Sequence, residues 1–286
     1  MATSAPKTVL IAGCGDLGTE VGLRFQALGH HVIGVRQRSE LLPAGFGRQS
    51  VDLRYNSPAI PDELSAVVIA LTAPARSEEE YRRTYVDGLR NVLSAIAASG
   101  QAPRVILVSS TAVYGVNDGT WVDESTPATG PTPTSAVLVE AESLVAAAAL
   151  ESCVLRLGGI YGPGRERLID QVRNGTARIP SVSAYTNRIH RDDAAQAIVH
   201  LASRQAAMPA IAIGVDEEPA ELGDVLTFLA EELQLPVPPQ GTAEPTGAAN
   251  RRLSSSLLRS TGFRFRYPTY REGYRSVLGG AQSRHP

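Results

Sequence analysis

The sequence predicts an α/β protein in which a doubly wound parallel sheet is followed by a smaller C-terminal cap. Three observations carry this prediction. They are a glycine-rich turn between an apolar run and a helix, an alternation of apolar runs with helical segments up to Leu157, and a change to Gly- and Pro-containing loops after it. Strands that alternate with helices form parallel sheets covered on both faces. A chain of 286 residues is long enough to bury the core that such a domain needs.

The first unit is built around the glycine turn. Residues 8–12 predict a short buried strand, the turn that follows reads Gly-Cys-Gly-Asp-Leu-Gly, and a helix from Leu17 to Leu28 stops at Gly29. His31 to Val35 then predicts a second strand. A strand, helix and strand within about 30 residues is the size of one βαβ unit.

Each glycine of the turn has a physical role. Gly13 allows the tight turn, Gly15 lets the backbone approach a pyrophosphate, and Gly18 lets the helix pack closely on the strand. Asp16 and Leu17 begin the helix, whose free N–H groups and dipole stabilise a phosphate. The motif in this context predicts dinucleotide binding by a Rossmann-type domain. The alternative is a glycine-rich turn without a ligand.

The end of the second strand distinguishes between two cofactors. A carboxylate there binds the ribose 2′-hydroxyl of NAD, whereas an arginine suits the 2′-phosphate of NADP. The strand is followed by Arg36 and Arg38, with Gln37 between them. These two arginines therefore favour NADP, with NAD left open; the alternative is that both simply face water.

Composition excludes several classes of function. A net charge of −2 and a pI near 6.2 provide no basic field for nucleic acid. The apolar run before the turn is too short for a membrane span and lacks the layout of a signal peptide, so we expect a cytoplasmic protein with no membrane partner. The five histidines show no ligand spacing, so no metal is expected, and Cys14 and Cys153 predict no disulfide. Lys7 is the only lysine and precedes the first strand, so a catalytic lysine is not expected.

The remaining elements follow in alternation. Strands are predicted at 8–12, 31–35, 51–53, 66–71, 104–108, 154–157 and 211–215. Helices are predicted at 17–28, 77–100 (opened by a Ser77/Glu80 capping box), 134–150, 168–172, 192–201, 220–233 and 252–259. We assign residues 1–157 to the nucleotide-binding domain, completed by about 186–215. Residues 158–185 and 216–286 form the smaller substrate-binding cap, which shares a cleft with the carboxyl edge of the sheet.

Five segments, in this order, resemble a known family. They are the glycine turn, Val51-Asp52-Leu53, the Ser109 to Gly115 segment SSTAVYG, the Arg156 to Gly164 segment RLGGIYGPG, and the Ile189 to Asp193 segment IHRDD. They resemble the extended short-chain dehydrogenases/reductases, the NAD(P)-dependent epimerase/dehydratase family, and within it the atypical YeeZ-like group. The resemblance covers nearly the whole chain. It implies an oxidoreductase or epimerase acting on a sugar-nucleotide-like or small carbonyl substrate.

The resemblance also implies roles for individual residues. Cofactor contacts fall on Asp52 and Leu53 at the adenine, on Leu71, Thr72 and Ala73 after the fourth strand, and on Gly158 and Ile160 near the nicotinamide. Ser110 falls at the position of the family's catalytic Ser/Thr. Arg165 and the loop before Asp192, which contains Arg188, would face the substrate. A homodimer through the helices at 77–100 and 134–150 is implied as well.

Two departures make the chain atypical. The family's turn is usually GxxGxxG, whereas this one is GxGxxG. Alignment on Glu142 places Thr134 and Leu138 where the family has the Tyr and Lys of its Tyr-x-x-x-Lys pair. In the family the Tyr is the general acid/base and the Lys lowers its pKa, so the two replacements cannot do this work. A tyrosine with an ordinary pKa of about 10 is a poor base at neutral pH without a nearby positive charge.

Several side chains could take over part of that role. Ser110 is expected to hydrogen-bond a substrate carbonyl, with a cap or turn hydroxyl as its alternative. Tyr114 is the first candidate for proton transfer, against a packing role. The weaker candidates are Tyr161, Tyr185 and His190, and also Asp192 and Asp193, which more simply begin a helix. Arg188 and Arg191 could hold an anionic substrate, with a solvated loop as the alternative. Tyr81 and Tyr85 lie one helical turn apart and predict a packing stripe.

Two hypotheses from different classes follow. In the first, the protein is an enzyme that uses NADP for oxidoreduction or epimerisation, with the nicotinamide supplying the hydride chemistry. In the second, it binds NADP without turnover and acts as a structural or redox-sensing protein. The absent Tyr and Lys favour the second hypothesis, whereas Ser110 and the glycines of the 158–164 loop favour the first.

Overall fold

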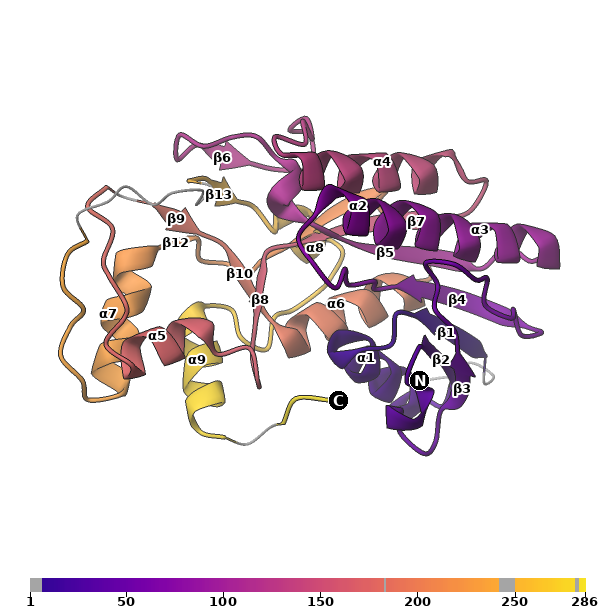
Figure 1. The fold of residues 1–286 in the computed structure, drawn as a ribbon, viewed down its shortest axis with the longest axis horizontal. Coiled ribbons are helices and arrows are strands. Elements are labelled where there is room, and N and C mark those ends of the chain that lie inside the picture. Colours follow the sequence, from indigo (N-terminus) through magenta and orange to yellow (C-terminus); the bar gives the residue numbers. More distant parts are fainter. Residues whose placement is uncertain (1–6, 183, 242–249, 281–282) are drawn as a thin grey trace.

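A computed structural model shows the fold and describes residues 7–182, 184–241, 250–280 and 283–286 (Figure 1). Its centre is a seven-stranded sheet made of β1 (Thr8–Ala12), β2 (His31–Arg36), β3 (Gly47–Ser50), β4 (Leu64–Ile69), β5 (Arg104–Ser110), β7 (Ser152–Leu157) and β11 (Ile211–Gly214). The strands run in the order β11-β7-β5-β4-β1-β2-β3, and every neighbouring pair is parallel. The predicted doubly wound α/β sheet of the Rossmann type is confirmed.

The strand order reverses at β1. The chain leaves β1 toward β2 and β3, and then returns to place β4 on the other side of β1. In open α/β sheets, ligands bind outside the carboxyl ends of the strands at this switch point. The backbone N–H groups of Gly13 and Cys14 both donate to the carbonyl of Val35, at 3.1 and 3.0 Å, and so hold the glycine turn against β2. The turn therefore lies at the one place where the topology opens a crevice.

Helices cover both faces of the sheet (Figure 1). One face carries α1 (Asp16–Ala27) and α6 (Arg191–Ser203); the other carries α2 (Glu78–Tyr81), η2 (Arg82–Asp87), α3 (Gly88–Ser99) and α4 (Pro133–Ala147). Alternate side chains of β1 point to opposite faces of the sheet and pack into different cores. Val9 and Ile11 join the core beneath α1 and α6, while Leu10 and Ala12 join the core beneath α3 and α4. This alternation follows from the two-residue period of a strand.

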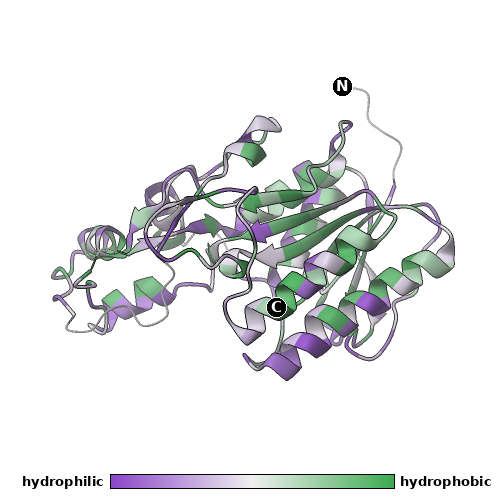
Figure 2. Cartoon of the chain, turned by 90° about the horizontal axis from the view of Figure 1, so that it is seen from above, coloured by the Kyte–Doolittle hydropathy of each residue, from purple (hydrophilic) through white to green (hydrophobic). Residues whose placement is uncertain are grey.

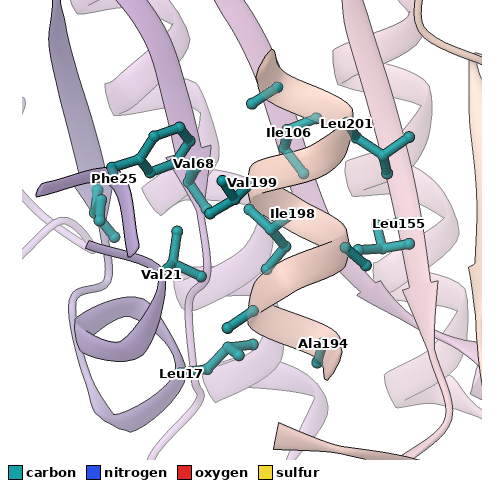
Figure 3. Close-up of a cluster of buried hydrophobic side chains, with 14 of the residues drawn as sticks. Leu17, Val21, Phe25, Val68, Ile106, Leu155, Ala194, Ile198, Val199 and Leu201 are labelled. Carbon is teal, nitrogen blue, oxygen red and sulfur yellow. The ribbon is translucent and has the colours of Figure 1, made fainter. Parts of the chain in front are cut away.

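The core beneath α6 shows why these helices dock (Figure 3). Leu17, Val21 and Phe25 recur every four residues on α1 and point toward Ile198 of α6, with Val68 of the sheet beside them. Burying each such side chain stabilises the fold by roughly 1.5–3 kcal/mol. Figure 2 shows the hydropathy of the whole chain: the central strands are largely hydrophobic (green), and the helices around them carry both hydrophobic (green) and hydrophilic (purple) residues.

The smaller part lies beyond the carboxyl edge of the sheet, at the end of the molecule that holds α7 (Figure 1). Its elements are β8 (Gly159–Tyr161), α5 (Arg167–Arg173), β9 (Tyr185–Thr186), β10 (Arg188–His190), β12 (Ala220–Glu221), α7 (Leu222–Glu232), β13 (Arg252–Leu253) and α9 (Tyr270–Leu278). Of these, α5, α7 and α9 share a separate apolar cluster that includes Ile169, Phe228 and Tyr274. The short helix α8 (Ser256–Ser260) instead packs against β11, and its Leu258 joins the core beneath α1 and α6. The predicted domain boundaries stay a prediction.

Several predicted elements differ in detail. The single helix predicted at 77–100 consists of α2, the π-helical η2 and α3. Ser77 caps it, since its side chain accepts the Glu80 N–H at 3.2 Å, but the Glu80 carboxylate pairs with Arg54 and Arg83, so the capping box is only half made. The strand predicted at 51–53 ends at Ser50. The helix predicted at 252–259 begins only at Ser256, because Arg252 and Leu253 pair with β6 (Trp121–Val122).

Short 3-10 turns complete the chain at η1 (Ser39–Leu41) and η3 (Thr111–Val113). In the part of the chain that the structure describes, no helix combines the length and the apolar character needed to cross a bilayer. Cys14 and Cys153 are both buried and carry free thiols.

Candidate functional site

Two cavities meet at the glycine turn. The first has a volume of about 350 Å³ and is lined by residues that follow β2, β3 and β4. The second, of about 510 Å³, is lined by the start of α1, the end of β5 and the start of α4. Gly13, Gly15, Ala70, Leu71 and Thr72 line both cavities. An elongated ligand that crosses the turn would therefore place one end in each cavity.

The three glycines of the turn do different work. Gly13 has φ +86°, and a Cβ there would lie 2.6 Å from the carbonyl oxygen of Ala70, so only glycine fits. A Cβ on Gly18 would lie 3.0 Å from the carbonyl oxygen of Gly13. A Cβ on Gly15 would meet no atom within 4 Å, so this residue faces open space.

The geometry of this turn fits a dinucleotide. Gly15 is the N-cap of α1, and no side chain caps the helix there. The first-turn N–H groups and the positive end of the helix dipole consequently face the cavities, where a pyrophosphate is stabilised. Asp16, Leu17 and Gly18 line the second cavity beside it.

The first cavity contains the predicted nucleotide ligands. Arg36, Arg38, Asp52 and Leu53 all line it. Arg54 lines it too, which the sequence analysis missed; its guanidinium donates to both carboxylate oxygens of Asp52, at 3.0 and 2.8 Å. The hydrogen bond from Arg54 lowers the pKa of Asp52. Arg36 donates from Nη1 to the carbonyl oxygen of Pro286 at 2.8 Å, so the C-terminal segment reaches this cavity.

The second cavity contains Ser110 at the end of β5. Its hydroxyl oxygen accepts the N–H of Ala112 at 3.2 Å, which caps the short η3 turn and leaves the hydroxyl proton to be donated. Thr134 and Leu138, the residues at the predicted Tyr and Lys positions, line the same cavity from α4. Both sequence-based interpretations of Ser110, turn cap and cavity hydroxyl, are thus compatible with its geometry.

Tyr114 is not brought to this cavity. It is fully buried, and its hydroxyl accepts a hydrogen bond from Arg156 at 2.8 Å. Burial raises the pKa of the Tyr114 hydroxyl despite the opposing effect of Arg156. A buried phenol bonded to an arginine favours the packing role that was the alternative for Tyr114, and a role in proton transfer stays a prediction.

Three other predicted contacts lie outside the linings of the two cavities. They are Ala73, Gly158 and Arg188. Arg188 is buried, its guanidinium donates to Thr186, and it stacks on the ring of Tyr270 at 5.3 Å. It is therefore neither a substrate ligand in this arrangement nor part of a solvated loop. Ile160, in contrast, lines the second cavity as predicted.

Arg165 lines the second cavity and pairs with the first residue of α1. Its Nε donates to Asp16 Oδ2 at 2.8 Å. Arg191 reaches Asp16 Oδ1 at 3.3 Å, and the backbone N–H of His285 donates to the same oxygen at 3.1 Å. Burial acts to raise the pKa of Asp16, but Arg165, His285 and Arg191 together lower it. These cations compensate a carboxylate that would otherwise repel a phosphate at the helix start.

The IHRDD segment is structural. The N-cap of α6 is His190 rather than Asp192, because its Nδ1 accepts the N–H of Asp192 at 3.2 Å. Burial lowers the pKa of His190 to about 4, so the ring is neutral. The Asp193 carboxylate accepts the backbone N–H groups of Arg266 and Tyr267, at 2.8 and 2.9 Å. Asp193 therefore ties the C-terminal part of the chain to the start of α6.

Three residues that line the second cavity were not assigned to it from the sequence. Tyr81 and Tyr85 pack against the apolar cluster that contains Leu138, in line with the predicted packing stripe, and they also line this cavity together with Arg76. The two rings lie 5.0 Å apart between centroids. Tyr85 lies in the π-helical η2, and such turns are frequent at functional sites. The π-helical turn would have pointed to these tyrosines, but it is visible only in the structure. Helical periodicity in the sequence does not reveal it.

Tyr161 is buried without a partner for its hydroxyl, and Tyr185 is half-buried in β9 beneath the guanidinium of Arg252. Neither lines the two cavities. Within the described ranges, His, Cys, Asp and Glu side chains form no group of three or more suited to a metal ion.

Comparisons with known proteins agree with this geometry. The sequence model of the NAD dependent epimerase/dehydratase family matches residues 9–214. Protein YeeZ of Escherichia coli K12 is 32% identical over 168 residues, which span 56% of this chain and 61% of YeeZ. A 3-diazoavenalumate denitrifying reductase of Streptomyces is 28% identical over 311 residues and covers 93% of this chain and 98% of its own.

Solved structures give the same result. A protein of Methylobacillus flagellatus, provisionally named an NAD-dependent epimerase/dehydratase, superposes with a TM-score of 0.80 at 36% identity, over 97% of this chain and 99% of its own. The UDP-glucuronic acid 4-epimerase of Bacillus cereus, solved in complex with NAD, shares the fold with a TM-score of 0.78 at 15% identity, over 96% of this chain and 100% of its own. These relatives support a nicotinamide cofactor. The chain belongs to the NAD-dependent epimerase/dehydratase family.

Proposed function

We propose that this protein binds NADP(H) across the glycine turn and catalyses oxidoreduction or epimerisation of a sugar-nucleotide-like or small carbonyl substrate. One observation carries the proposal: of the two cavities that meet at Gly15, the first is lined by Arg36 and Arg38 and the second by Ser110. This is the polarity that a dinucleotide with a 2′-phosphate and a reactive ring requires.

The residues of the chain have distinct tasks in this proposal. The amides at the start of α1 hold the pyrophosphate, and Arg36 and Arg38 hold the 2′-phosphate. The nicotinamide, when bound, supplies the hydride chemistry. Ser110 donates its hydroxyl proton in a hydrogen bond to the substrate oxygen, and Arg165, which lines the same cavity, contributes positive charge for an anionic substrate group.

The choice of NADP is tested by titrating NADP and NAD while following the melting temperature. We expect NADP to stabilise the wild type more strongly, because a ligand that binds only the folded state stabilises it according to its concentration relative to Kd. Arg36→Ala should weaken NADP at least tenfold and leave NAD within threefold. Arg90→Ala, on the exposed side of α3, is the control and should change neither. A preference for NAD that Arg36→Ala leaves unchanged would contradict the proposal.

A second candidate function is NADP binding without turnover, in a structural or redox-sensing role. Thr134 and Leu138 favour it, since neither side chain in the second cavity can replace a Tyr and Lys pair. A panel of sugar nucleotides and small carbonyls assayed for NADPH oxidation separates the two. Turnover that Ser110→Ala abolishes at unchanged cofactor affinity supports the enzyme. Tight NADP binding without turnover on the whole panel supports the second function. The homodimer through residues 77–100 and 134–150 stays a prediction.

A further inference from the structure

Carbonyl reduction at Ser110 requires a proton donor, and the second cavity offers few. A hydride that reaches a carbonyl carbon leaves negative charge on the oxygen, which must take up a proton. Efficient donors have a pKa near the working pH, and aliphatic hydroxyls lie far above it. Phenols, at about 10, are closer. Among the described residues that line this cavity, the phenols are Tyr81 and Tyr85.

Several other polar groups of the cavity are already held in hydrogen bonds or ion pairs. Ser109 donates to Glu142 at 2.6 Å, and Asp16 is paired with Arg165 and Arg191. Thr132 and Ser135 satisfy each other in the capping box of α4, since each accepts the backbone N–H of the other, at 3.2 and 2.9 Å. These groups stabilise local structure and are not placed to release a proton.

Packing places the two tyrosines against α4. Their rings lie 5.0 Å apart at 56° and pack on the apolar cluster that contains Leu138. Both are partly exposed, whereas Tyr114 is fully buried. Thr134 and Leu138 line the cavity from α4, and no charged residue of α4 lines it. Where α2, η2 and α4 line the cavity, the titratable groups are therefore the hydroxyls of Tyr81 and Tyr85.

Tyr85 lies within the π-helical η2, whereas Tyr81 is the last residue of α2. Burial raises the pKa of Tyr85, and the neighbouring Tyr81 adds to this rise, while a hydrogen bond with the backbone of Ala73 and the charge of Arg76 act to lower it. The charged residues that line the cavity are Arg76, Asp16 and Arg165, and Asp16 and Arg165 are paired with each other. Arg76 is exposed at the cavity mouth and is the cation that acts on Tyr85.

We propose that Tyr85, which lies on η2 and lines the same cavity as Ser110 and Arg76, is the proton donor of the reaction. This inference rests on the proposed function. The O–H bond of Tyr85 breaks as a new O–H bond forms on the former carbonyl oxygen of the substrate. The phenolate that remains takes a proton from water through the open cavity, and Arg76 stabilises its charge. Tyr81 supplies the neighbouring ring that keeps Tyr85 in place.

The first test reads the phenol itself and needs no substrate. NADP⁺ and NADPH are added at pH 9–10.5, and tyrosinate is followed by its absorbance near 295 nm. The oxidised nicotinamide carries a positive charge, so NADP⁺ should increase tyrosinate and NADPH should not. The increase should disappear in Tyr85→Phe and persist in Tyr81→Phe and in Tyr55→Phe, whose side chain is 60% exposed and lines neither cavity. An unchanged signal in Tyr85→Phe, or no signal in a wild type that binds NADP⁺, overturns the proposal.

The second test measures turnover with 9,10-phenanthrenequinone and NADPH at 340 nm. Loss of a general acid typically costs 10²–10⁴-fold, so Tyr85→Phe should lower kcat by at least 100-fold with the Kd for NADPH changed less than threefold. Tyr81→Phe should lose less than fivefold and Tyr55→Phe nothing. A Tyr85→Phe variant that keeps more than half of kcat overturns the assignment.

Arg76 offers a variant that leaves the core untouched, because its side chain is exposed. Arg76→Gln should shift the basic limb of the kcat–pH profile, and Arg76→Lys should restore it. A profile that Arg76→Gln leaves unchanged counts against the pairing with Tyr85. Failure of the proposed function itself would look different: the wild type would then bind neither NADP nor NAD. That result is obtained before any tyrosine variant is compared.

Discussion

Arg156 and Glu142 form a buried ion pair, with Nη2 and Oε2 2.6 Å apart and side-chain exposures of 5% and 8%. Arg156 comes from β7 and Glu142 from α4, and the same carboxylate accepts the hydroxyl of Ser109 at 2.6 Å. Arg156 also donates to Tyr114 at 2.8 Å. This network fastens the end of β5, from which Ser110 reaches the cavity, to the inner face of α4.

Removing the cation of this network should destabilise the fold. Arg156→Met leaves the Glu142 carboxylate buried without its counter-charge, and breaking a buried ion pair in this way typically costs about 3–5 kcal/mol. The measurement is urea unfolding. The double variant Arg156→Met/Glu142→Leu should recover most of the loss, since apolar replacement of both partners is often neutral. A single variant as stable as wild type would show that the pair contributes nothing to stability.

The glycine turn allows folding and binding to be separated. Gly13→Ala introduces a Cβ 2.6 Å from the Ala70 carbonyl oxygen at φ +86° and should lower stability by about 1–3 kcal/mol. Gly15→Ala meets no atom within 4 Å in the protein, so its stability should stay within about 0.5 kcal/mol of wild type. Its Cβ instead enters the space proposed for the pyrophosphate, and NADP affinity should fall at least tenfold. Melting curves with and without NADP measure both effects, and a Gly15→Ala variant with normal affinity would move the pyrophosphate elsewhere.

Stability should depend on pH through Asp216. Burial raises the pKa of this carboxyl to about 8, whereas an unfolded Asp titrates near 3.9. Between about pH 4 and pH 8 the folded state therefore holds a proton that the unfolded state has released. The free energy of unfolding should fall as pH rises through this window, by up to about 1.4 kcal/mol per pH unit.

Asp216→Asn tests this dependence, because it removes the titrating group and should flatten the decline. Urea unfolding at pH 5, 6.5 and 8 gives the measurement. Asp62→Asn, at an exposed position, is the control and should follow wild type. Parallel pH curves for wild type and Asp216→Asn would assign the decline to another group.

A close contact inside the smaller part of the molecule lies between α9 and the end of β8. A Cβ on Gly273 of α9 would lie 1.7 Å from Tyr161 Oη, so Gly273→Ala should destabilise the protein by several kcal/mol. The Tyr161 hydroxyl is buried without a partner, so Tyr161→Phe alone should cost little. The double variant should be more stable than Gly273→Ala, because the nearest colliding atom is gone. Additive losses in denaturant unfolding would mean that these two residues do not interact.

Local patterns predicted most of the sheet correctly. Apolar runs of β-branched residues mark buried strands whatever surrounds them, so β1, β2, β4, β5, β7 and β11 lie within a few residues of their predicted places. Predictions failed where a contact from a distant segment decided the outcome. Arg252 and Leu253 pair with β6 instead of beginning a helix, and Glu80 pairs with Arg54 instead of completing its capping box.

In the candidate site, too, local patterns located some residues, and distant contacts decided the positions of others. Gly13, Gly15, Arg36, Asp52 and Ser110 line the two cavities, because each lies at or shortly after the end of a strand and the carboxyl ends of parallel strands meet at one edge. Tyr114 also follows a strand, yet it turns inward to Arg156, a partner 42 residues away in the sequence.

The sequence by itself determined the βαβ unit, the position of the glycine turn and the identity of the residues at the strand ends, because these depend on short-range periodicity and backbone sterics. Only the tertiary structure decided that His190 caps α6, that Arg188 is buried, and that Tyr81 and Tyr85 face a cavity. Such outcomes depend on which distant groups pack against a side chain and whether they satisfy its hydrogen bonds. That information is not present in the spacing of residues along one segment.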